Sequence, residues 1–294
     1  MIIKISKYAG FCFGVERAIN LALKAAKKFR KVYTLGDLIH NKREIERLKK
    51  FGIVPVNVSY QDINKVFKEG DIVIIRSHGV PPYVYELLKK VGAKIIDATC
   101  PFVKQVHKKI QILQKENYPT CIFGDPDHPE VIGIAGYAKE SIIIRDFSDL
   151  KKIEKKSKLG IVCQTTFKID LFQSLISKLV LKVKDLKVFN TICSATYLRQ
   201  EDAKKLASQV DIMFVIGGKN SSNTNKLYKV CKEVNKNTYL IESKEEIPCD
   251  ILKDIESKNI GITAGASTPK WIIEEIVTFL KTFENLKSLK VSCG

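Results

Sequence analysis

Apolar residues follow two patterns that alternate along the chain. Short continuous apolar runs are typical of buried strands, whereas apolar residues spaced three or four positions apart are typical of amphipathic helices. Helical spacing is clear in GVERAINLALKAAKKF after Cys12, in PFVKQVHKKIQIL after Cys100 and in SATYLRQEDAKKLASQV after Cys193. A strand-like run precedes each of these segments. The alternation of strands and helices predicts an α/β protein with mainly parallel sheets.

The three cysteines occupy equivalent positions in this pattern. A glycine that ends the next strand follows each cysteine by 24 residues, and a polar residue follows it by 28 residues. These positions are Gly36, Gly124 and Gly217, followed by His40, His128 and Ser221. Further along each unit, another apolar run ends in a polar group that contains His78, Thr165 or Ser267. The matching offsets indicate an internal repeat.

A repeat of about 90 residues suits three small α/β domains. We expect them to span residues 1–97 with Cys12, 98–190 with Cys100 and 191–294 with Cys193. Ligands bind at the carboxyl ends of strands in parallel sheets. Three copies around a pseudo-threefold axis would therefore direct their strand-end loops toward one central cavity.

The repeated cysteines are candidate metal ligands. A thiol at a helix N-terminus favours the thiolate form, which binds metals. Zinc sites with an open position usually contain histidine or carboxylate ligands, whereas thiolates hold iron–sulfur clusters. Cys12, Cys100 and Cys193 therefore predict one 4Fe–4S cluster with three protein ligands and one open iron. The other cysteines are not repeated and are expected to be structural, with Cys249 in a loop.

Histidines and small polar residues follow the strands at repeated positions. Imidazoles, hydroxyls and amides next to helix N-termini can bind phosphate oxygens. The candidate ligands of a small diphosphate are His40, His78, His128, Ser221, Ser222, Asn223 and Ser267. His107 lies within a helical segment, and we expect it to be structural.

Glu130 is the one carboxylate that the repeat places at the predicted cavity, two residues after His128. Burial would raise its pKa and allow it to donate a proton near neutral pH. The alternative is a surface carboxylate that caps the following segment. Thr165, flanked by Gln164 and Thr166, could bind a substrate hydroxyl and relay that proton, although threonine is also common in strands for packing reasons.

Composition and charge limit the classes of protein. The chain has 294 residues, of which 45% are hydrophobic, and its apolar runs are too short to span a membrane. Charged residues near the N-terminus argue against a signal peptide, so we expect a cytoplasmic protein. The net charge of +18 favours anionic ligands or acidic partners. The lysines are scattered and have no stacking aromatics beside them, which argues against nucleic acid.

Several segments resemble the 4-hydroxy-3-methylbut-2-enyl diphosphate reductase family, in order from residue 11 to about residue 270. These segments are AGFCFGVERAI, DATCPFVKQVH, HPEV, QTT, ICSATYLRQ, KNSSNTNKL and TAGAST. The resemblance implies a three-domain fold around a central 4Fe–4S cluster, bound through Cys12, Cys100 and Cys193. It also implies that two electrons and protons remove the allylic hydroxyl of the substrate as water, giving isopentenyl and dimethylallyl diphosphates.

The same resemblance implies roles for individual residues. It makes Glu130 the proton donor and Thr165 the residue that contacts the substrate hydroxyl. It places the diphosphate on His40, His78, His128, Ser221, Ser222, Asn223 and Ser267. Electrons would come from a small carrier such as ferredoxin or flavodoxin, whose usual acidity suits a protein of charge +18.

Two alternatives stay open from the residues alone. A quinolinate-synthase-like enzyme also has three repeated α/β domains and a three-cysteine cluster, but the HPEV and SSN segments do not belong to it. A non-enzymatic iron–sulfur sensor would bind nucleic acid through a basic face with strong salt dependence. The scattered lysines and the neutral pocket argue against that sensor.

Overall fold

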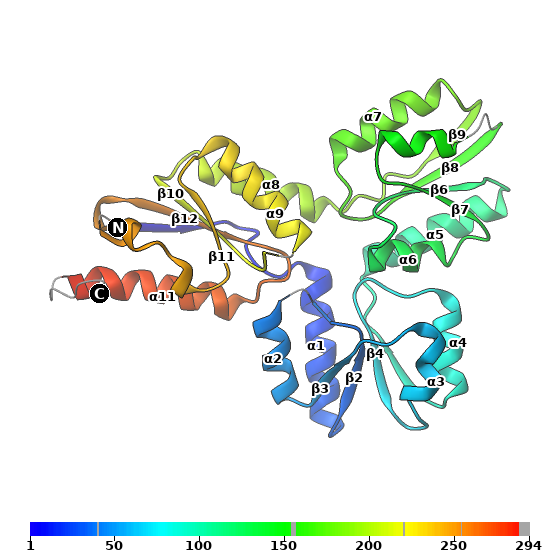
Figure 1. The fold of residues 1–294 in the computed structure, drawn as a ribbon, viewed down its shortest axis with the longest axis horizontal. Coiled ribbons are helices and arrows are strands. Elements are labelled where there is room, and N and C mark those ends of the chain that lie inside the picture. The colour runs from blue at the N-terminus through cyan, green and yellow to red at the C-terminus, as the bar shows by residue number, and fades with distance from the viewer. Residues whose placement is uncertain (40, 154–156, 220, 254, 288–294) are drawn as a thin grey trace. The chain divides into compact units, whose positions relative to one another are not determined.

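Strands and helices alternate along the computed structural model, which describes residues 1–39, 41–153, 157–219, 221–253 and 255–287 (Figure 1). The described residues form three four-stranded sheets, and neighbouring strands in each sheet are parallel. This arrangement confirms the predicted α/β fold class with three repeated parallel layers.

The first sheet has the strand order β3-β2-β4-β5. Its strands are β2 (Val32–Leu35), β3 (Ile53–Val56), β4 (Ile72–Ile75) and β5 (Lys94–Asp97). The helices in this part of the chain are α1 (Phe13–Lys28), α2 (Lys42–Lys50), α3 (Ile63–Val66) and α4 (Pro82–Lys90), with a 3-10 turn η1 (Tyr60–Asp62). Buried Val73 and Ile75 of β4 pack with Val84 and Leu88 of α4.

The second sheet has the order β7-β6-β8-β9. Its strands are β6 (Thr120–Phe123), β7 (Ser141–Ile144), β8 (Lys158–Cys163) and β9 (Asp185–Val188). The associated helices are α5 (Pro101–Lys115), α6 (Pro129–Ala135) and α7 (Ile169–Val180), with a 3-10 segment η2 (Phe147–Lys152). Side chains of α5 and α6 pack with Ile122 and Val162, whereas those of α7 pack with Phe123 and Ile161. Since successive strand residues point to opposite faces, helices cover both faces of this sheet.

The third sheet has the order β1-β12-β10-β11. Its strands are β1 (Ile2–Ile5), β10 (Ile212–Ile216), β11 (Thr238–Ile241) and β12 (Asn259–Ala264). The associated helices are α8 (Ser194–Ala207), α9 (Ser222–Val234), α10 (Cys249–Lys253) and α11 (Lys270–Lys287), with 3-10 turns η3 (Lys244–Glu246) and η4 (Ile255–Ser257). Residues of α8 and α9 pack with Met213 and Val215, and residues of α11 pack with Phe214 and Ile216.

The three sheets have equivalent strand orders, and the third is completed by the start of the chain. One edge strand of each sheet is equivalent: β5 lies next to β4, β9 lies next to β8, and β1 lies next to β12. Each of these edge strands leads to one of the repeated cysteines. Ile2 pairs with Asn259 and Ile5 pairs with Ile262. The domain boundaries at residues 97 and 190 stay a prediction. Strand β1 does not share a sheet with the other strands of residues 1–97, because it joins the sheet of residues 212–264.

The described chain divides into two compact units. One contains residues 1–15, 39–46 and 194–294 and holds the third sheet. The other contains residues 16–38 and 47–193 and holds the first and second sheets. We call them unit 1 and unit 2, and the candidate residues are described within each.

Each repeated cysteine lies at a helix start, as predicted. Helix α1 begins one residue after Cys12, α8 begins one residue after Cys193, and Cys100 is the residue before the first residue of α5. Pro101 occupies the first position of α5, where its missing N–H leaves no hydrogen bond unmade. The loop predicted at Cys249 is wrong, because this residue begins the short helix α10, whose buried Ile251 and Leu252 anchor it to the core.

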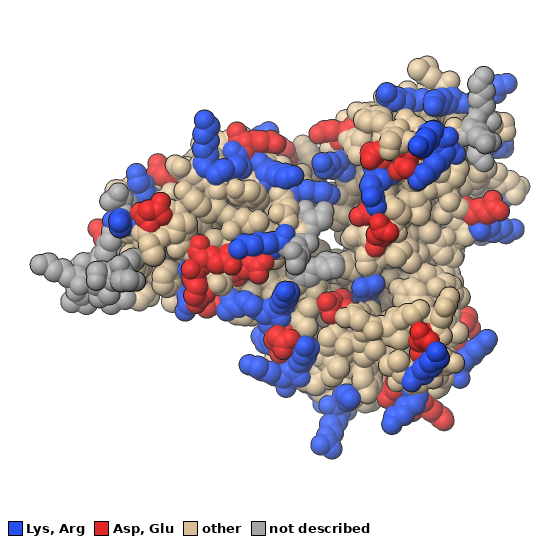
Figure 2. Space-filling model, in the orientation of Figure 1, with Lys and Arg blue, Asp and Glu red and all other residues tan. Residues whose placement is uncertain are grey.

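Figure 2 shows how charged side chains are distributed on one face of the protein. On the face in Figure 2, lysines and arginines lie over helices and loops and are interspersed with acidic residues. Mixed charges of this kind oppose the single-sign field that a nucleic-acid-binding face requires. Among the described residues, no helix combines the length and the apolar character needed to span a membrane.

Candidate functional site

Glu130 and Thr165 form the most buried polar contact among the predicted site residues of unit 2. Glu130 is the second residue of α6, and Thr165 lies in the loop that follows β8. The Thr165 backbone N–H donates to Glu130 Oε1 at 2.6 Å, and the Thr165 hydroxyl donates to Oε2 at 2.8 Å. Strands β6 and β8 are parallel neighbours, so the loops at their carboxyl ends meet at one sheet edge.

The Glu130 carboxyl is removed from water. The residue is 3% exposed, so it is not the surface carboxylate of the alternative interpretation. Burial raises the pKa of Glu130 to about 7, although both hydrogen bonds from Thr165 favour the ionised form. A carboxyl with this pKa exchanges protons near neutral pH, which is the property expected of a general acid.

His128 is fixed by the helix that carries Glu130. It is the N-cap residue of α6, and its Nδ1 accepts a hydrogen bond of 3.1 Å from the Glu130 backbone N–H. Because Nδ1 acts as an acceptor, a neutral His128 carries its proton on Nε2. The His78 ring lies edge-to-face with the His128 ring, with their centroids 5.3 Å apart. The two predicted phosphate ligands of unit 2 are therefore neighbours.

Two glycines allow α6 to approach the loop that carries His78. A Cβ atom at Gly133 would lie 3.4 Å from the Gly79 backbone, and one at Gly136 would lie 2.4 Å from Pro81 Cβ. The second distance is shorter than any ordinary contact between carbon atoms, so only glycine fits at Gly136. The small residues of α6 thus bring the end of the first sheet next to the end of the second.

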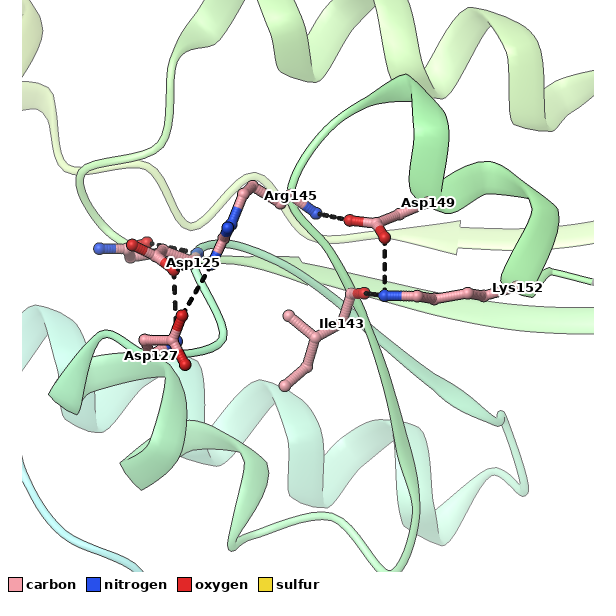
Figure 3. A network of polar contacts seen from close by, with 7 residues as sticks. Asp125, Asp127, Ile143, Arg145, Asp149 and Lys152 are labelled. Carbon is pink, nitrogen blue, oxygen red and sulfur yellow. Dashed lines mark hydrogen bonds and ion pairs between the residues drawn. The ribbon is translucent and has the colours of Figure 1, made fainter.

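Gln164 joins two strand-end loops of the second sheet. Its Oε1 accepts from the Asp125 backbone N–H at 3.1 Å, and its Nε2 donates to the Thr166 hydroxyl at 3.1 Å. In addition, Arg145 binds Asp125 at 2.6 Å and Asp127 at 2.9 Å (Figure 3). Both ends of the Gln164 amide are thus engaged within the protein, and its substrate contact stays a prediction.

The repeated cysteines share one backbone contact. The Cys100 N–H donates to the Ser77 carbonyl at 2.9 Å, the Cys193 N–H donates to the Thr165 carbonyl at 2.8 Å, and in unit 1 the Cys12 N–H donates to the Ala266 carbonyl at 3.2 Å. The acceptors lie in the loops after β4, β8 and β12: Ser77 and Ala266 immediately precede His78 and Ser267, and the third acceptor is Thr165 itself. The equivalence of these loops, inferred from sequence offsets, therefore has a structural counterpart.

Exposure separates these three cysteines from most of the others. Cys12, Cys100 and Cys193 are partly exposed, whereas Cys121, Cys163 and Cys231 are buried in the apolar cores. Burial raises the pKa values of those core thiols, which opposes thiolate formation. Three accessible thiols at helix starts fit an iron–sulfur cluster, whose usual protein ligand is the cysteine thiolate.

The cysteines are distributed over both units. Cys12 belongs to unit 1, and Cys100 and Cys193 belong to unit 2. Among the residues that the structure describes, no three His, Cys, Asp or Glu side chains gather closely enough to hold a metal ion. A ligand set formed by all three cysteines therefore stays a prediction.

Unit 1 presents neutral polar groups at the start of α9. Ser221 is the N-cap residue, and its hydroxyl accepts from the Thr224 N–H at 3.3 Å. Ser267 is buried in the loop between β12 and α11. The side-chain nitrogen of Asn223 is buried and has no hydrogen-bond partner among the described residues. An unsatisfied buried donor costs about 1–3 kcal/mol, so this nitrogen is suited to an anionic ligand.

Two of the predicted phosphate ligands cannot be placed as fully as the rest. His40 lies outside the described residues. Ser222 is the first residue of α9, and its side chain is not described.

His107, predicted to be structural, is 5% exposed and stacks on Tyr137 with 3.9 Å between ring centroids. Burial lowers the pKa of His107 to about 4, so this imidazole is neutral at pH 7.

Sequence reasoning missed two arginines that bind the backbone just before the repeated cysteines. Arg199 of α8 binds the carbonyls of Tyr8 and Gly10, and Arg17 of α1 binds those of Asp97 and Thr99. Arg199 lies in the hydrophobic stripe of α8 near Ala203 and Leu206, which all become buried. An arginine on a buried helical face is the signal that would have identified it.

Known proteins resemble this chain over most of its length. Residues 3–281 match the family described as LytB protein. The 4-hydroxy-3-methylbut-2-enyl diphosphate reductase of Aquifex aeolicus is 48% identical over 92% of this chain and 93% of its own length. The reductase of the same name from Clostridioides difficile is 46% identical over 96% of this chain and 99% of its own length.

Solved structures with a similar fold carry related names. One, of (E)-4-hydroxy-3-methyl-but-2-enyl diphosphate reductase, has a TM-score of 0.78 and 46% identity, and covers 96% of this chain and all of its own. Another, of the E-1-hydroxy-2-methyl-but-2-enyl-4-diphosphate reductase from Plasmodium falciparum, has a TM-score of 0.84 and 32% identity, and covers 96% of this chain and 89% of its own.

The fold, the site and these relatives define an oxidoreductase built from three repeated α/β layers. The chain belongs to the LytB protein family. The expectation of a reductase is thereby confirmed, and the non-enzymatic sensor is set aside.

Proposed function

We propose that this chain reduces 4-hydroxy-3-methylbut-2-enyl diphosphate in the non-mevalonate route to isoprenoids. Two electrons and two protons replace the allylic hydroxyl by hydrogen, and the products are isopentenyl or dimethylallyl diphosphate and one water molecule. The observation that carries this proposal is the Glu130–Thr165 pair, in which a buried carboxyl with a pKa of about 7 holds a hydroxyl 2.8 Å away. The names of the relatives supply the substrate.

Cys12, Cys100 and Cys193 are the residues that would hold a 4Fe–4S cluster with one open iron. Their partial exposure and their positions at helix starts leave their sulfurs accessible to a metal, in contrast to the thiols in the apolar cores. The cluster would supply the two electrons in single steps and a Lewis-acidic iron for the allylic oxygen.

Glu130 and Thr165 supply one of the two protons. At pH 7 about half of the Glu130 side chains carry a proton, given a pKa of about 7. When Oε2 is protonated, the hydrogen bond reverses: Oε2–H donates to Thr165 Oγ, and the Thr165 hydroxyl is free to donate to the departing oxygen of the substrate. The Thr165 N–H at Oε1 stabilises the carboxylate that remains.

Neutral donors bind the diphosphate in this proposal. In unit 2, the donors are His78 and the Nε2–H of His128, whose tautomer is set by the Glu130 N–H. In unit 1, the donors include the side-chain nitrogen of Asn223, for which the described part of the chain supplies no hydrogen-bond partner. The full set is His40, His78, His128, Ser221, Ser222, Asn223 and Ser267, with Gln164 and Thr166 beside Thr165. Neutral donors fit a small diphosphate, because hydrogen bonds to an ionised acceptor are the stronger kind.

The electron donor is a small acidic carrier of the ferredoxin or flavodoxin type. The net charge of +18 supports this assignment, since complementary charge accelerates protein association. Electron transfer from such a carrier should therefore slow as ionic strength rises.

The test of the proposed function is anaerobic reconstitution with iron and sulfide, followed by a reduction assay with the diphosphate substrate and an artificial electron donor. Cys100→Ser should lose most of its iron–sulfur absorbance, and its turnover should fall to background. Cys249→Ser is the matched control, because this thiol is exposed and lies outside the predicted ligand set. Full absorbance and turnover in Cys100→Ser would refute the ligand assignment, and a reconstituted wild-type protein without turnover would refute the proposed activity.

A further inference from the structure

A buried arginine holds the segment that carries Cys12. Arg199 of α8 is 4% exposed, although its guanidinium is always charged. Its Nε donates to the Tyr8 carbonyl at 2.8 Å, and one Nη donates to the Gly10 carbonyl at 2.7 Å. Burying a charge is unfavourable unless hydrogen bonds satisfy it, so these two hydrogen bonds are needed to keep Arg199 buried.

The same segment is held from its other side by the third sheet. The Gly10 N–H donates to the Ala264 carbonyl at 3.3 Å, and the Cys12 N–H donates to the Ala266 carbonyl at 3.2 Å. Gly10 has a φ of +90°, and a Cβ there would lie 3.1 Å from the Thr268 carbonyl oxygen. The backbone before Cys12 is therefore fixed through its carbonyls by Arg199 and through its N–H groups by the loop after β12.

A second arginine repeats this arrangement before Cys100. Arg17 of α1 donates to the Thr99 carbonyl at 3.2 Å and to the Asp97 carbonyl at 3.4 Å. Its hydrogen bonds are longer than those of Arg199, and its side chain is only partly buried. In both places, a helix that begins after one repeated cysteine binds the carbonyls that precede another.

We propose that Arg199 is a positioning residue for the Cys12 thiolate, and that Arg17 has the same role, more weakly, for Cys100. This inference rests on the proposed function, because it assumes that both thiols bind the iron–sulfur cluster. Each arginine bridges two carbonyls separated by one residue, which limits rotation of the peptide groups leading to the ligand. Binding sites need such support, since a ligand that deviates by about 0.5 Å binds its metal less well.

The test compares variants of Arg199 with a control on the same helix. Arg199→Met removes both hydrogen bonds and keeps a long apolar side chain, whereas Arg199→Lys keeps the charge but loses the planar guanidinium. Asp202→Asn is the matched control, because Asp202 binds the Ser6 hydroxyl at 2.6 Å and so links α8 to the same N-terminal segment, farther from Cys12 in sequence. Cys12→Ser is the reference for a lost ligand.

Three measurements distinguish positioning from a purely structural role. They are the rate of iron release to a chelator, the electron paramagnetic resonance spectrum of the reduced cluster, and the melting temperature of the cluster-free protein. Arg199→Met should release iron about 10- to 100-fold faster than wild type, as other outer-shell substitutions do. Its spectrum should change, Arg199→Lys should be intermediate, and Asp202→Asn should keep the wild-type spectrum and a release rate within about twofold of wild type.

Wild-type spectrum and release rate in Arg199→Met, with only a lower melting temperature, would overturn the proposal. Should Arg199→Met fail to fold, Arg199→Lys and Arg17→Met decide instead, and wild-type spectra and release rates in both would also overturn it. If Cys12→Ser itself keeps the cluster, the ligand assignment under the proposed function has failed. The two failures are therefore distinguishable.

Discussion

The strand-end loops of the two units offer different chemistry from equivalent positions. In unit 2, the loops present a titratable carboxyl, and the Thr165 hydroxyl and N–H satisfy both of its oxygens. In unit 1, the corresponding loops present Ser221, Asn223 and Ser267, none of which titrates near pH 7, and the Asn223 nitrogen has no partner among the described residues. The repeat thus supplies one scaffold, and a few side chains give unit 2 a titratable carboxyl and unit 1 neutral hydrogen-bonding groups.

The largest expected effect tests the proton-transfer side of this comparison. Glu130→Gln keeps the size of the side chain but cannot donate a carboxyl proton, so kcat should fall by ~10²–10⁴-fold. Substrate affinity should change far less, because the diphosphate ligands remain. Turnover with an artificial electron donor and equilibrium binding measure the two effects.

Glu140→Gln is the control for that substitution, since Glu140 is an exposed carboxyl of the same unit. It should leave both quantities unchanged. Wild-type turnover in Glu130→Gln would remove Glu130 from the mechanism and would leave unit 2 without an identified proton donor.

The next effect concerns the pH dependence of stability. The pKa of Glu130 is about 7 in the folded protein, above its ordinary value of 4.5, so folding favours the protonated form. Below pH 4.5 the side chain is neutral in both states and adds no pH-dependent term. As the pH rises to about 7 and beyond, ionisation stabilises the unfolded chain by up to about 3 kcal/mol relative to the folded one.

Glu130→Gln removes this ionisation. The difference in free energy of unfolding, variant minus wild type, should therefore be larger at pH 8 than at pH 4.5 by up to about 3 kcal/mol. Urea titrations of the cluster-free proteins at both pH values measure the two differences. A difference independent of pH would show that the Glu130 carboxyl is solvated and that its pKa is not raised.

The next prediction tests the anion-binding side of the comparison through KM. Asn223→Ala removes a donor to an ionised ligand, which is worth about 1.5–3 kcal/mol, so KM should rise at least tenfold with little change in kcat. The stability of the ligand-free protein should stay equal or rise, because the substitution removes a buried donor that no described residue satisfies.

Asn235→Ala provides the opposite result at the far end of the same helix. The Asn235 side chain donates to the Ala207 and Val210 carbonyls, so its loss should lower stability and leave KM unchanged. If Asn223→Ala lowers stability without affecting KM, the anion-binding role of unit 1 is wrong.

Much of this organisation could be predicted from the sequence, because it depends on local patterns. The offsets after Cys12, Cys100 and Cys193 located three strand ends, and each following helix begins where its apolar spacing begins. Glu130 could be singled out because it follows the repeated position of His128 by two residues. Its contact with Thr165 depends on the pairing of β6 with β8, which no local pattern specifies.

The features that escaped prediction depend on contacts between distant parts of the chain. The repeat could not show that β1 completes the sheet of residues 212–264, because the strand and its partner lie at opposite ends of the sequence. Arg199 was missed for a similar reason, since its acceptors Tyr8 and Gly10 lie more than 180 residues away. Both amide ends of Gln164 are used inside the protein, which its position beside Thr165 does not reveal.

The smallest expected effect tests what holds the loop of residues 124–128 in unit 2. Arg145 binds Asp125 and Asp127 on the surface, and its side chain is 50% exposed (Figure 3). The buried Gln164 side chain accepts from the Asp125 N–H of the same loop. Exposed ion pairs contribute little to stability, so Arg145→Met should lower the free energy of unfolding only slightly. Because the buried contact remains, kcat and KM should stay within about twofold of wild type, as steady-state kinetics would show. A tenfold rise in KM would instead mean that the surface ion pairs position His128, and unit 2 would then depend on charge as well as on burial.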